Sequence, residues 1–180
     1  RIFLPPFRTP VNPNIHPGVT TGVNLIGTAM ANRFAMLDMP GVISGTSYSM
    51  WWNGGMRTAP YFHNMIGILT ETAHATPTPR YYDPAKKPGT VGGKRADGTD
   101  IWYPFPWQGG ESHFRDAVDY MIESSMALLD MAAAKKESFL YNFYKMGRDA
   151  IENEKEAFAY IISGDQWDKG ESIELTNILI

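Results

Sequence analysis

A short apolar run that ends in a single carboxylate most constrains the fold of this chain. Residues 65–69 are apolar or glycine, and the run continues through Thr70 to Glu71. Apolar runs of this length, bounded by turn signals, are typical of buried strands. A carboxylate at the end of such a strand loses hydration, which is costly unless the group is paired, hydrogen-bonded or protonated. We therefore predict a buried strand over 66–71 and a functional role for Glu71.

Composition limits the class of protein. The chain has 180 residues, 43% of them hydrophobic, which suits one domain with a substantial core. Its formal net charge is −3, without a long basic block, so we expect no nucleic-acid partner. It has no cysteine, which leaves His, Asp and Glu as the strong metal ligands. No apolar stretch approaches the roughly 20 residues of a membrane-spanning helix, so we expect no membrane partner either.

The first third of the chain predicts a strand, a helix and a shaped loop. Residues 2–4 indicate a strand that is stopped by two prolines. Apolar positions at helical spacing predict a helix over 17–37, with Asn14 as a possible cap. The glycine-rich segment 45–55 carries three aromatic residues and predicts a long loop, and residues 57–64 predict a short helix.

The rest of the chain predicts a long loop and two helices. Residues 76–110 are rich in proline, glycine and aromatic residues, so we expect a loop draped over the domain, with a hairpin around 96–99. Helices are expected over about 112–135 and 139–152. We assign residues 1–156 to one domain. Residues 157–180, with a strand over 158–162 and a helix over 172–180, are expected to open a possible following domain.

Several side chains have both a chemical and a structural interpretation. Arg57 could bind a carboxylate through two hydrogen bonds or equally cap the short helix. The pair Trp51 and Trp52, like the cluster over 102–107, could stack on a sugar or an aromatic side chain, although core packing is the favoured interpretation. His74 could share a cleft with Glu71, although a solvated loop histidine is favoured.

The sequence contains no self-contained catalytic motif. His113 and Asp116 have a metal-ligand spacing, but a position at a helix start favours a capping role. The four histidines lack the spacing of a zinc helix motif, and neither a nucleophile elbow nor a phosphate-binding loop is present.

Five short blocks carry a resemblance to a known family. The blocks are RIFLPPF at 1–7, NPN at 12–14, GTAMA at 27–31, RTAPY at 57–61 and GILTETA at 67–73. In this order they resemble the C-terminal part of the catalytic domain of large bacterial zinc carboxypeptidases, of the carboxypeptidase A-like metallopeptidase family. The resemblance covers nearly the whole chain. It implies an α/β fold, namely part of an α/β/α sandwich around a mixed sheet, in a fragment that lacks its N-terminal half.

The resemblance also implies a reaction and a set of site residues. Glu71 matches the catalytic glutamate, the general base toward a metal-activated water and then the proton donor to the leaving amine. Tyr48 resembles a tyrosine that hydrogen-bonds the substrate. The family arginines that bind the terminal carboxylate of the substrate map mostly upstream, and we assign that role to Arg57 from its own chemistry rather than from the resemblance. One zinc ion is implied, with its ligands upstream of this chain, so we expect no metal ligand here and no activity from the fragment alone.

Location and alternative functions follow from the same resemblance. We expect a secreted bacterial protein, extracellular or periplasmic. Two other functions stay open, namely a non-catalytic domain that binds peptide or glycan and an amidase that acts on cell-wall peptides.

Overall fold

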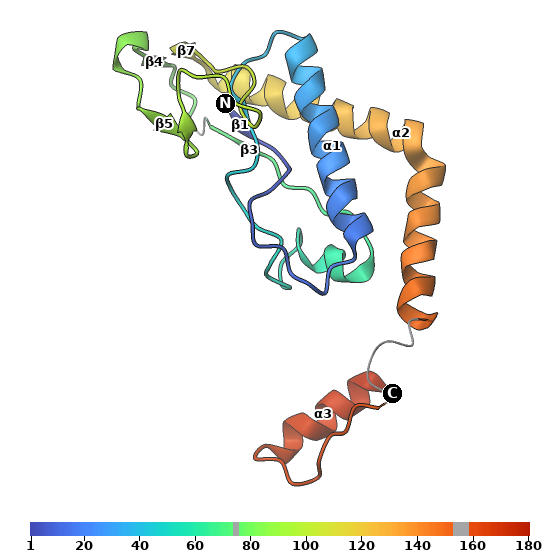
Figure 1. The fold of residues 1–180 in the computed structure, drawn as a ribbon. Helices are drawn as coiled ribbons and strands as arrows, with labels where there is room; N and C mark the ends of the chain where they lie inside the picture. The colour runs from blue at the N-terminus through green and yellow to red at the C-terminus, as the bar shows by residue number, and fades with distance from the viewer. Residues whose placement is uncertain (74–75, 153–158) are drawn as a thin grey trace. The chain divides into compact units, whose positions relative to one another are not determined.

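The computed structural model describes residues 1–73, 76–152 and 159–180 (Figure 1). The chain divides into two compact units, Arg1–Gly147 and Arg148–Ile180, and each is described by itself. The domain boundary expected between residues 156 and 157 lies outside the described residues. The first unit combines helices with a small mixed sheet, so the broad α/β class is confirmed.

A three-stranded sheet of very short strands forms the centre of the first unit. Strand β1 (Ile2–Phe3) lies between β2 (Val42–Ile43), which is parallel to it, and β3 (Glu71–Thr72), which is antiparallel. Proline at positions 5 and 6 limits β1, because proline has no backbone N–H to donate to a neighbouring strand. The expected first strand is therefore confirmed, and its shortness limits the strands that pair with it.

Helix α1 (Pro17–Met36) confirms the helix expected over 17–37. Its cap is His16, whose Nδ1 accepts a hydrogen bond of 3.0 Å from the backbone N–H of Gly18. The proposed cap Asn14 was wrong, because a capping side chain must reach the N–H groups of the first turn and Asn14 lies two residues too early. Pro17 at the first helical position has the backbone torsion that a helix needs.

A single long helix replaces the two that the sequence predicts. Helix α2 (Phe114–Glu152) continues through residues 132–138, where three alanines, two lysines and a glutamate favour helix and no glycine or proline interrupts it. Figure 1 shows α2 changing direction partway along its length. The division into two helices was therefore wrong, although the stretches assigned to helix are helical.

Two clusters of buried side chains form the core of the first unit. The first joins β1 and β2 to the second half of α1 and to α2, through Ile2, Leu4, Ile26, Met30, Phe34, Val42, Tyr120 and Ala127. The second joins the first half of α1 to the region after β2 and to α2, through Ile15, Val19, Val23, Met50, Tyr61 and Met146. Tyr61 belongs to a 3-10 helix over Ala59–His63, close to the short helix expected over 57–64.

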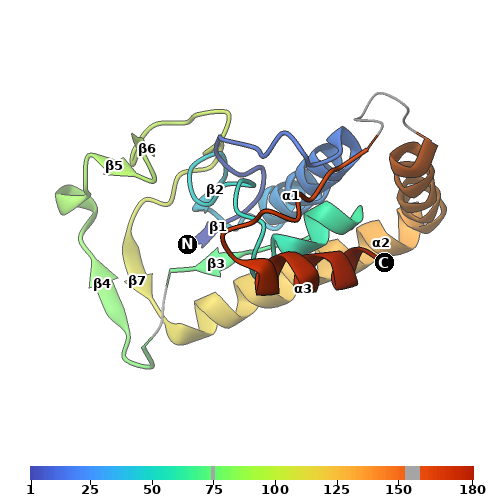
Figure 2. The same ribbon diagram turned by 90° about the horizontal axis from the view of Figure 1, so that it is seen from below.

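Residues 80–109, which we call the strap, pack over one side of the first unit (Figure 2). Strand β4 (Arg80–Tyr82) pairs with β7 (Gly110–Ser112), and a 3-10 helix over Pro84–Lys86 follows β4. Strands β5 (Thr90–Val91) and β6 (Lys94–Arg95) form a hairpin. Its turn is Gly92-Gly93, both with positive φ, so the hairpin expected around 96–99 was placed a few residues too late.

The second unit contains helix α3 (Lys169–Leu179), which begins three residues before the expected start at 172. Asp168 caps it by accepting a hydrogen bond of 3.1 Å from the backbone N–H of Glu171. Of the strand expected over 158–162, residue 158 lies outside the described residues, and 159–162 form no strand. Within its described part, this unit offers no strand for pairing. Throughout the described ranges, no helix is long and apolar enough to cross a membrane.

Candidate functional site

Glu71 begins a strand rather than ending one, which corrects the prediction for 66–71. Residues 65–70 form no strand, because β1 offers partners only to Glu71 and Thr72 and the carbonyl of Gly67 accepts a hydrogen bond of 3.0 Å from the Tyr61 hydroxyl. The Glu71 residue is exposed, so the expectation of a desolvated carboxylate was wrong. A functional role for Glu71 therefore depends on the residues that contact it.

The phenol of Tyr48 donates a hydrogen bond of 3.0 Å to Glu71 Oε2, across 23 residues of sequence. Tyr48 has φ of +61°, in the left-handed region that costs an L-residue roughly 1–2 kcal/mol. Partial burial raises the pKa of Tyr48, and so do the hydrogen bond to Glu71 and the negative charge of the Glu71 carboxylate. The phenol therefore stays protonated at neutral pH and is available as a hydrogen-bond donor.

Arg57 lies beside Tyr48 and Phe7. Its guanidinium carbon is 4.9 Å from the ring centroid of Phe7 and 5.5 Å from that of Tyr48. These two rings contact each other edge to face, with centroids 6.1 Å apart. Arg57 Nη1 also donates a hydrogen bond of 3.1 Å to the carbonyl of Ser49, which ties the loop of Tyr48 to the short helix that follows. Arg57 thus contacts Tyr48, and Tyr48 contacts Glu71.

The three site residues predicted from the sequence therefore form one group, which we call the Tyr48 cluster (Tyr48, Arg57 and Glu71). Glycine at position 67 lets the segment before Glu71 pass close to Arg57. A Cβ at this position would lie 2.0 Å from the carbonyl oxygen of Arg57. Only glycine permits such a close approach of two backbone segments. An exposed carboxylate, a protonated phenol and a guanidinium together could bind a polar group and move a proton.

The two tryptophans of the loop before Arg57 are exposed, so their interpretation as core residues was wrong. Trp51 is 51% exposed and Trp52 is 65% exposed. The ring of Trp52 lies against the Gly54-Gly55 backbone, where a Cβ on Gly54 would come within 2.5 Å of it. These glycines leave room for the ring, and its exposure leaves it available for stacking.

The histidines add no metal site to the described chain. The backbone N–H of His113 donates a hydrogen bond of 2.8 Å to Asp116 Oδ2 at the start of α2. His74 lies outside the described residues. Across residues 1–73, 76–152 and 159–180, no three side chains among His, Cys, Asp and Glu are grouped to hold a metal ion.

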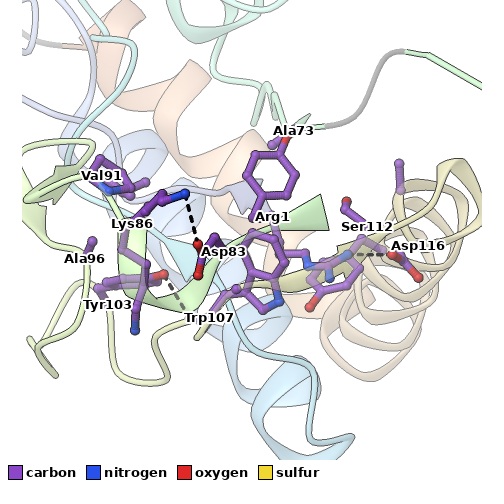
Figure 3. Close-up of a pocket in the computed structure, with 16 residues that line it drawn as sticks. Arg1, Ala73, Asp83, Lys86, Val91, Ala96, Tyr103, Trp107, Ser112 and Asp116 are labelled. Carbon is purple, nitrogen blue, oxygen red and sulfur yellow. Dashed lines mark hydrogen bonds and ion pairs between the residues drawn. The ribbon is translucent and has the colours of Figure 1, made fainter. Parts of the chain in front are cut away.

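A cavity of about 240 Å³ lies between the strap and the start of α2 (Figure 3), and sequence reasoning did not predict it. Aromatic side chains line much of it, including Tyr82, Tyr103, Trp107 and Tyr120. None of the residues of the Tyr48 cluster lines it, although Ala73, two residues after Glu71, does. The aromatic residues within 76–110 were the available signal, because Tyr82, Tyr103 and Trp107 of this segment line the cavity.

Comparison of the chain with protein-family models, with curated proteins and with solved structures finds no match. The relation to zinc carboxypeptidases that the sequence blocks suggest therefore stays a prediction. The chain itself has a mixed α/β fold in which Tyr48 joins Arg57 to Glu71.

Proposed function

We propose that this chain is the C-terminal part of a zinc-carboxypeptidase-like hydrolase that cleaves a terminal amide bond of a peptide. The proposal includes an α/β/α sandwich for the complete domain, of which this chain would supply a part. One observation supports it most, the hydrogen bond of 3.0 Å from the Tyr48 phenol to Glu71. Two residues assigned to one site by resemblance are thereby in direct contact.

Glu71 is proposed to move the proton in this reaction. Its carboxylate would accept a proton from water as the water oxygen bonds to the carbonyl carbon, and would deliver that proton to the amine nitrogen as the C–N bond breaks. Tyr48 would hold the carboxylate and offer its phenol to the substrate. Arg57 would bind a carboxylate of the peptide, for which a guanidinium is well suited.

The resemblance implies one zinc ion, and the described residues do not fit it. No group of three potential ligands exists among them, and Glu71 contributes a single carboxylate that already accepts a hydrogen bond from Tyr48. Residues outside this chain, in the proposed N-terminal half of the domain, would have to hold the ion. We therefore assign no reaction step to the metal. The extracellular or periplasmic location of the protein likewise stays a prediction.

Glu71→Gln tests this function. We would measure release of the terminal residue from a peptide library that includes cell-wall stem peptides, using the longest natural form of the protein and added zinc. The variant should lower the rate by about a hundredfold to ten-thousandfold, as loss of a proton shuttle does. Glu137→Gln, at another exposed glutamate, is the matched control and should leave the rate unchanged.

Either of two results would contradict the proposal. Absence of any peptide hydrolysis by the natural protein would remove the hydrolase function. An unchanged rate in Glu71→Gln would remove Glu71 from the mechanism. Hydrolysis restricted to cell-wall stem peptides would identify the protein as the amidase variant of the same function.

A non-catalytic domain that binds peptide or glycan is the second candidate, favoured by the exposed ring of Trp52. Trp52→Ala would then lower ligand affinity on peptide and glycan arrays while Glu71→Gln would not. Trp167→Ala provides the control, because Trp167 is fully exposed and belongs to the other unit. Equal binding by the two tryptophan variants would contradict this candidate.

A further inference from the structure

We propose that the cavity beneath the strap binds a small aromatic carboxylate. The proposal does not depend on the hydrolase function, because none of the residues of the Tyr48 cluster lines the cavity. It depends on three properties of the cavity walls: their aromatic character, their rigidity and their charge.

Aromatic rings make the walls suitable for another ring. Tyr82 and Trp107 contact each other edge to face, with centroids 5.2 Å apart at an interplanar angle of 73°. The guanidinium of Arg1 lies 4.3 Å from the centroid of the Trp107 ring. Pro88, Val91 and Ala117 complete an apolar lining. An aromatic ligand gains both area burial and ring-to-ring contacts in such surroundings.

Hydrogen bonds hold the strap in place, so the cavity is formed before a ligand enters. The carbonyl of Phe105 accepts from the Gly41 N–H at 2.8 Å, and the carbonyl of Trp102 accepts from the Ser44 N–H at 2.9 Å. Within the strap, the Tyr103 hydroxyl accepts from the Trp107 N–H at 3.0 Å. A preformed site binds more tightly because less ordering is needed on binding.

On the α2 side, one buried tyrosine and an ion pair fix the wall. Tyr120 is 5% exposed and donates a hydrogen bond to the carbonyl of Pro40. Its burial raises the pKa of the Tyr120 phenol to about 12, so this wall carries no phenolate at neutral pH. Arg1 Nη1 pairs with Asp116 Oδ2 at 2.7 Å, as Figure 3 shows, and Arg1 Nη2 donates to the carbonyl of Glu111 at 3.1 Å.

The charges of the lining favour an anion. Three basic and two acidic residues line the cavity, which leaves a surplus of one positive charge. Asp116 neutralises Arg1, and Asp83 lies 3.5 Å from the Lys86 ammonium. The ammonium of Lys87 instead donates a hydrogen bond of 2.7 Å to Gln108 Oε1, an uncharged amide oxygen. Lys87 is therefore the cation we assign to the ligand carboxylate.

The volume limits the ligand to a small molecule. About 240 Å³ is less than the roughly 300–1,000 Å³ of sites for drug-sized ligands. A single ring with a short acidic side chain suits this space. The same chemistry occurs in a free metabolite and at the C-terminus of a peptide that ends in an aromatic residue, and the test separates these sources.

The test uses calorimetric titration of the full chain with three matched probes. The probes are 3-phenylpropionate, its neutral amide and the cationic 3-phenylpropylamine. The acid should bind at least about threefold more tightly than the amide, as expected for one partly exposed ion pair. The amine should bind most weakly. A tetrapeptide that ends in phenylalanine distinguishes the sources, because it should bind as well as the acid only if the cavity accepts a chain end.

Variants locate the binding within the cavity. Ala117→Leu fills the space from α2 and should weaken acid binding at least tenfold. Lys87→Gln, on a strap residue outside the core, should weaken it about threefold. Lys135→Gln on the exposed part of α2 is the matched control and should have no effect. Lys87→Gln keeps the proposal testable should Ala117→Leu fail to fold.

Four results would overturn the proposal. The acid and the amide could bind equally, or the acid could fail to bind at all. Ala117→Leu and Lys87→Gln could both leave the affinity unchanged. Binding that is weakened by Arg57→Lys would place the probe at the Tyr48 cluster instead. Because no hydrolysis is measured, these results are separate from those that test the proposed function.

Discussion

The Tyr48 cluster and the cavity beneath the strap are candidate sites of opposite character. The cluster has an exposed carboxylate, Glu71, held by a hydrogen bond from Tyr48, whereas the cavity is lined by rings and has two buried tyrosines in its wall. Sequence reasoning singled out the three residues of the cluster, and it did not single out the cavity. The difference shows that local motifs can mark exposed chemistry, whereas enclosed space depends on how distant segments pack.

Gly67→Ala should have the largest effect and should separate the two sites. A Cβ would lie 2.0 Å from the Arg57 carbonyl oxygen, so the backbone must shift, which should lower the free energy of unfolding by about 2–3 kcal/mol in urea denaturation. Peptide hydrolysis should fall with it, whereas binding of 3-phenylpropionate should persist wherever the variant is folded.

Gly89→Ala is the control for this substitution. Gly89 belongs to the strap, and no atom lies within 4 Å of the position of its added Cβ, so stability should change little. Equal stability of the two variants would show that the close approach at Gly67 is not needed to form the Tyr48 cluster.

Asp116→Asn should have an intermediate effect and acts on the cavity wall. Burial favours the neutral carboxyl, but hydrogen bonds from the His113 N–H and from Arg1 outweigh it and hold the pKa of Asp116 below its ordinary value of 3.8. At neutral pH the substitution should cost about 1–2 kcal/mol, because it removes charge-assisted hydrogen bonds.

The pH dependence of that cost has a defined sign. A pKa that is lower in the folded state gives stability that is fully present above the unfolded value of about 3.8 and is lost as the pH falls through the folded value. The difference in the free energy of unfolding between the parent and Asp116→Asn should therefore shrink in denaturation curves measured below pH 3.8. A gap that widens on acidification would contradict this account. Asp165→Asn changes an exposed residue of the other unit and should show no such difference in stability from the parent.

Arg57→Lys should have the smallest effect and tests how the Tyr48 cluster is held. Lysine keeps the charge but loses the planar contact with the Phe7 and Tyr48 rings and the hydrogen bond to Ser49. We expect a loss of about 0.5–1 kcal/mol in thermal or urea unfolding. Arg80→Lys, at an exposed residue of β4, should lose less. A larger loss at Arg80 would show that the contacts of Arg57 are not structural.

The fold could be predicted from the sequence where local signals were strong. Helix α1 was recognised from its apolar spacing, and the stop after β1 from two prolines. The predicted extent of the strand over 66–71 was wrong because the length of a strand depends on its partner, and β1 offers only two residues for pairing. The predicted burial of Trp52 was wrong because its place against Gly54-Gly55 depends on how the loop turns.

The candidate site was predicted as a set of residues but not as an environment. Resemblance brought Tyr48 and Glu71 together, Arg57 was added from its own chemistry, and the three are in contact through Tyr48. The argument from burial that first indicated Glu71 failed, because exposure is decided by tertiary packing rather than by neighbouring apolar residues. The cavity needed Arg1, the strap and α2 together, and these are distant in sequence.

The central claim, that Tyr48 and Glu71 act as one unit, is tested most directly by a double-mutant cycle. The rate of terminal peptide hydrolysis, as kcat/KM, would be measured for the parent, Tyr48→Phe, Glu71→Gln and the double variant. Residues that act together give non-additive effects, with coupling of about 0.5–3 kcal/mol. We expect Tyr48→Phe to cost much less once Glu71 has been replaced. Costs that simply add, in variants that fold like the parent, would contradict the claim.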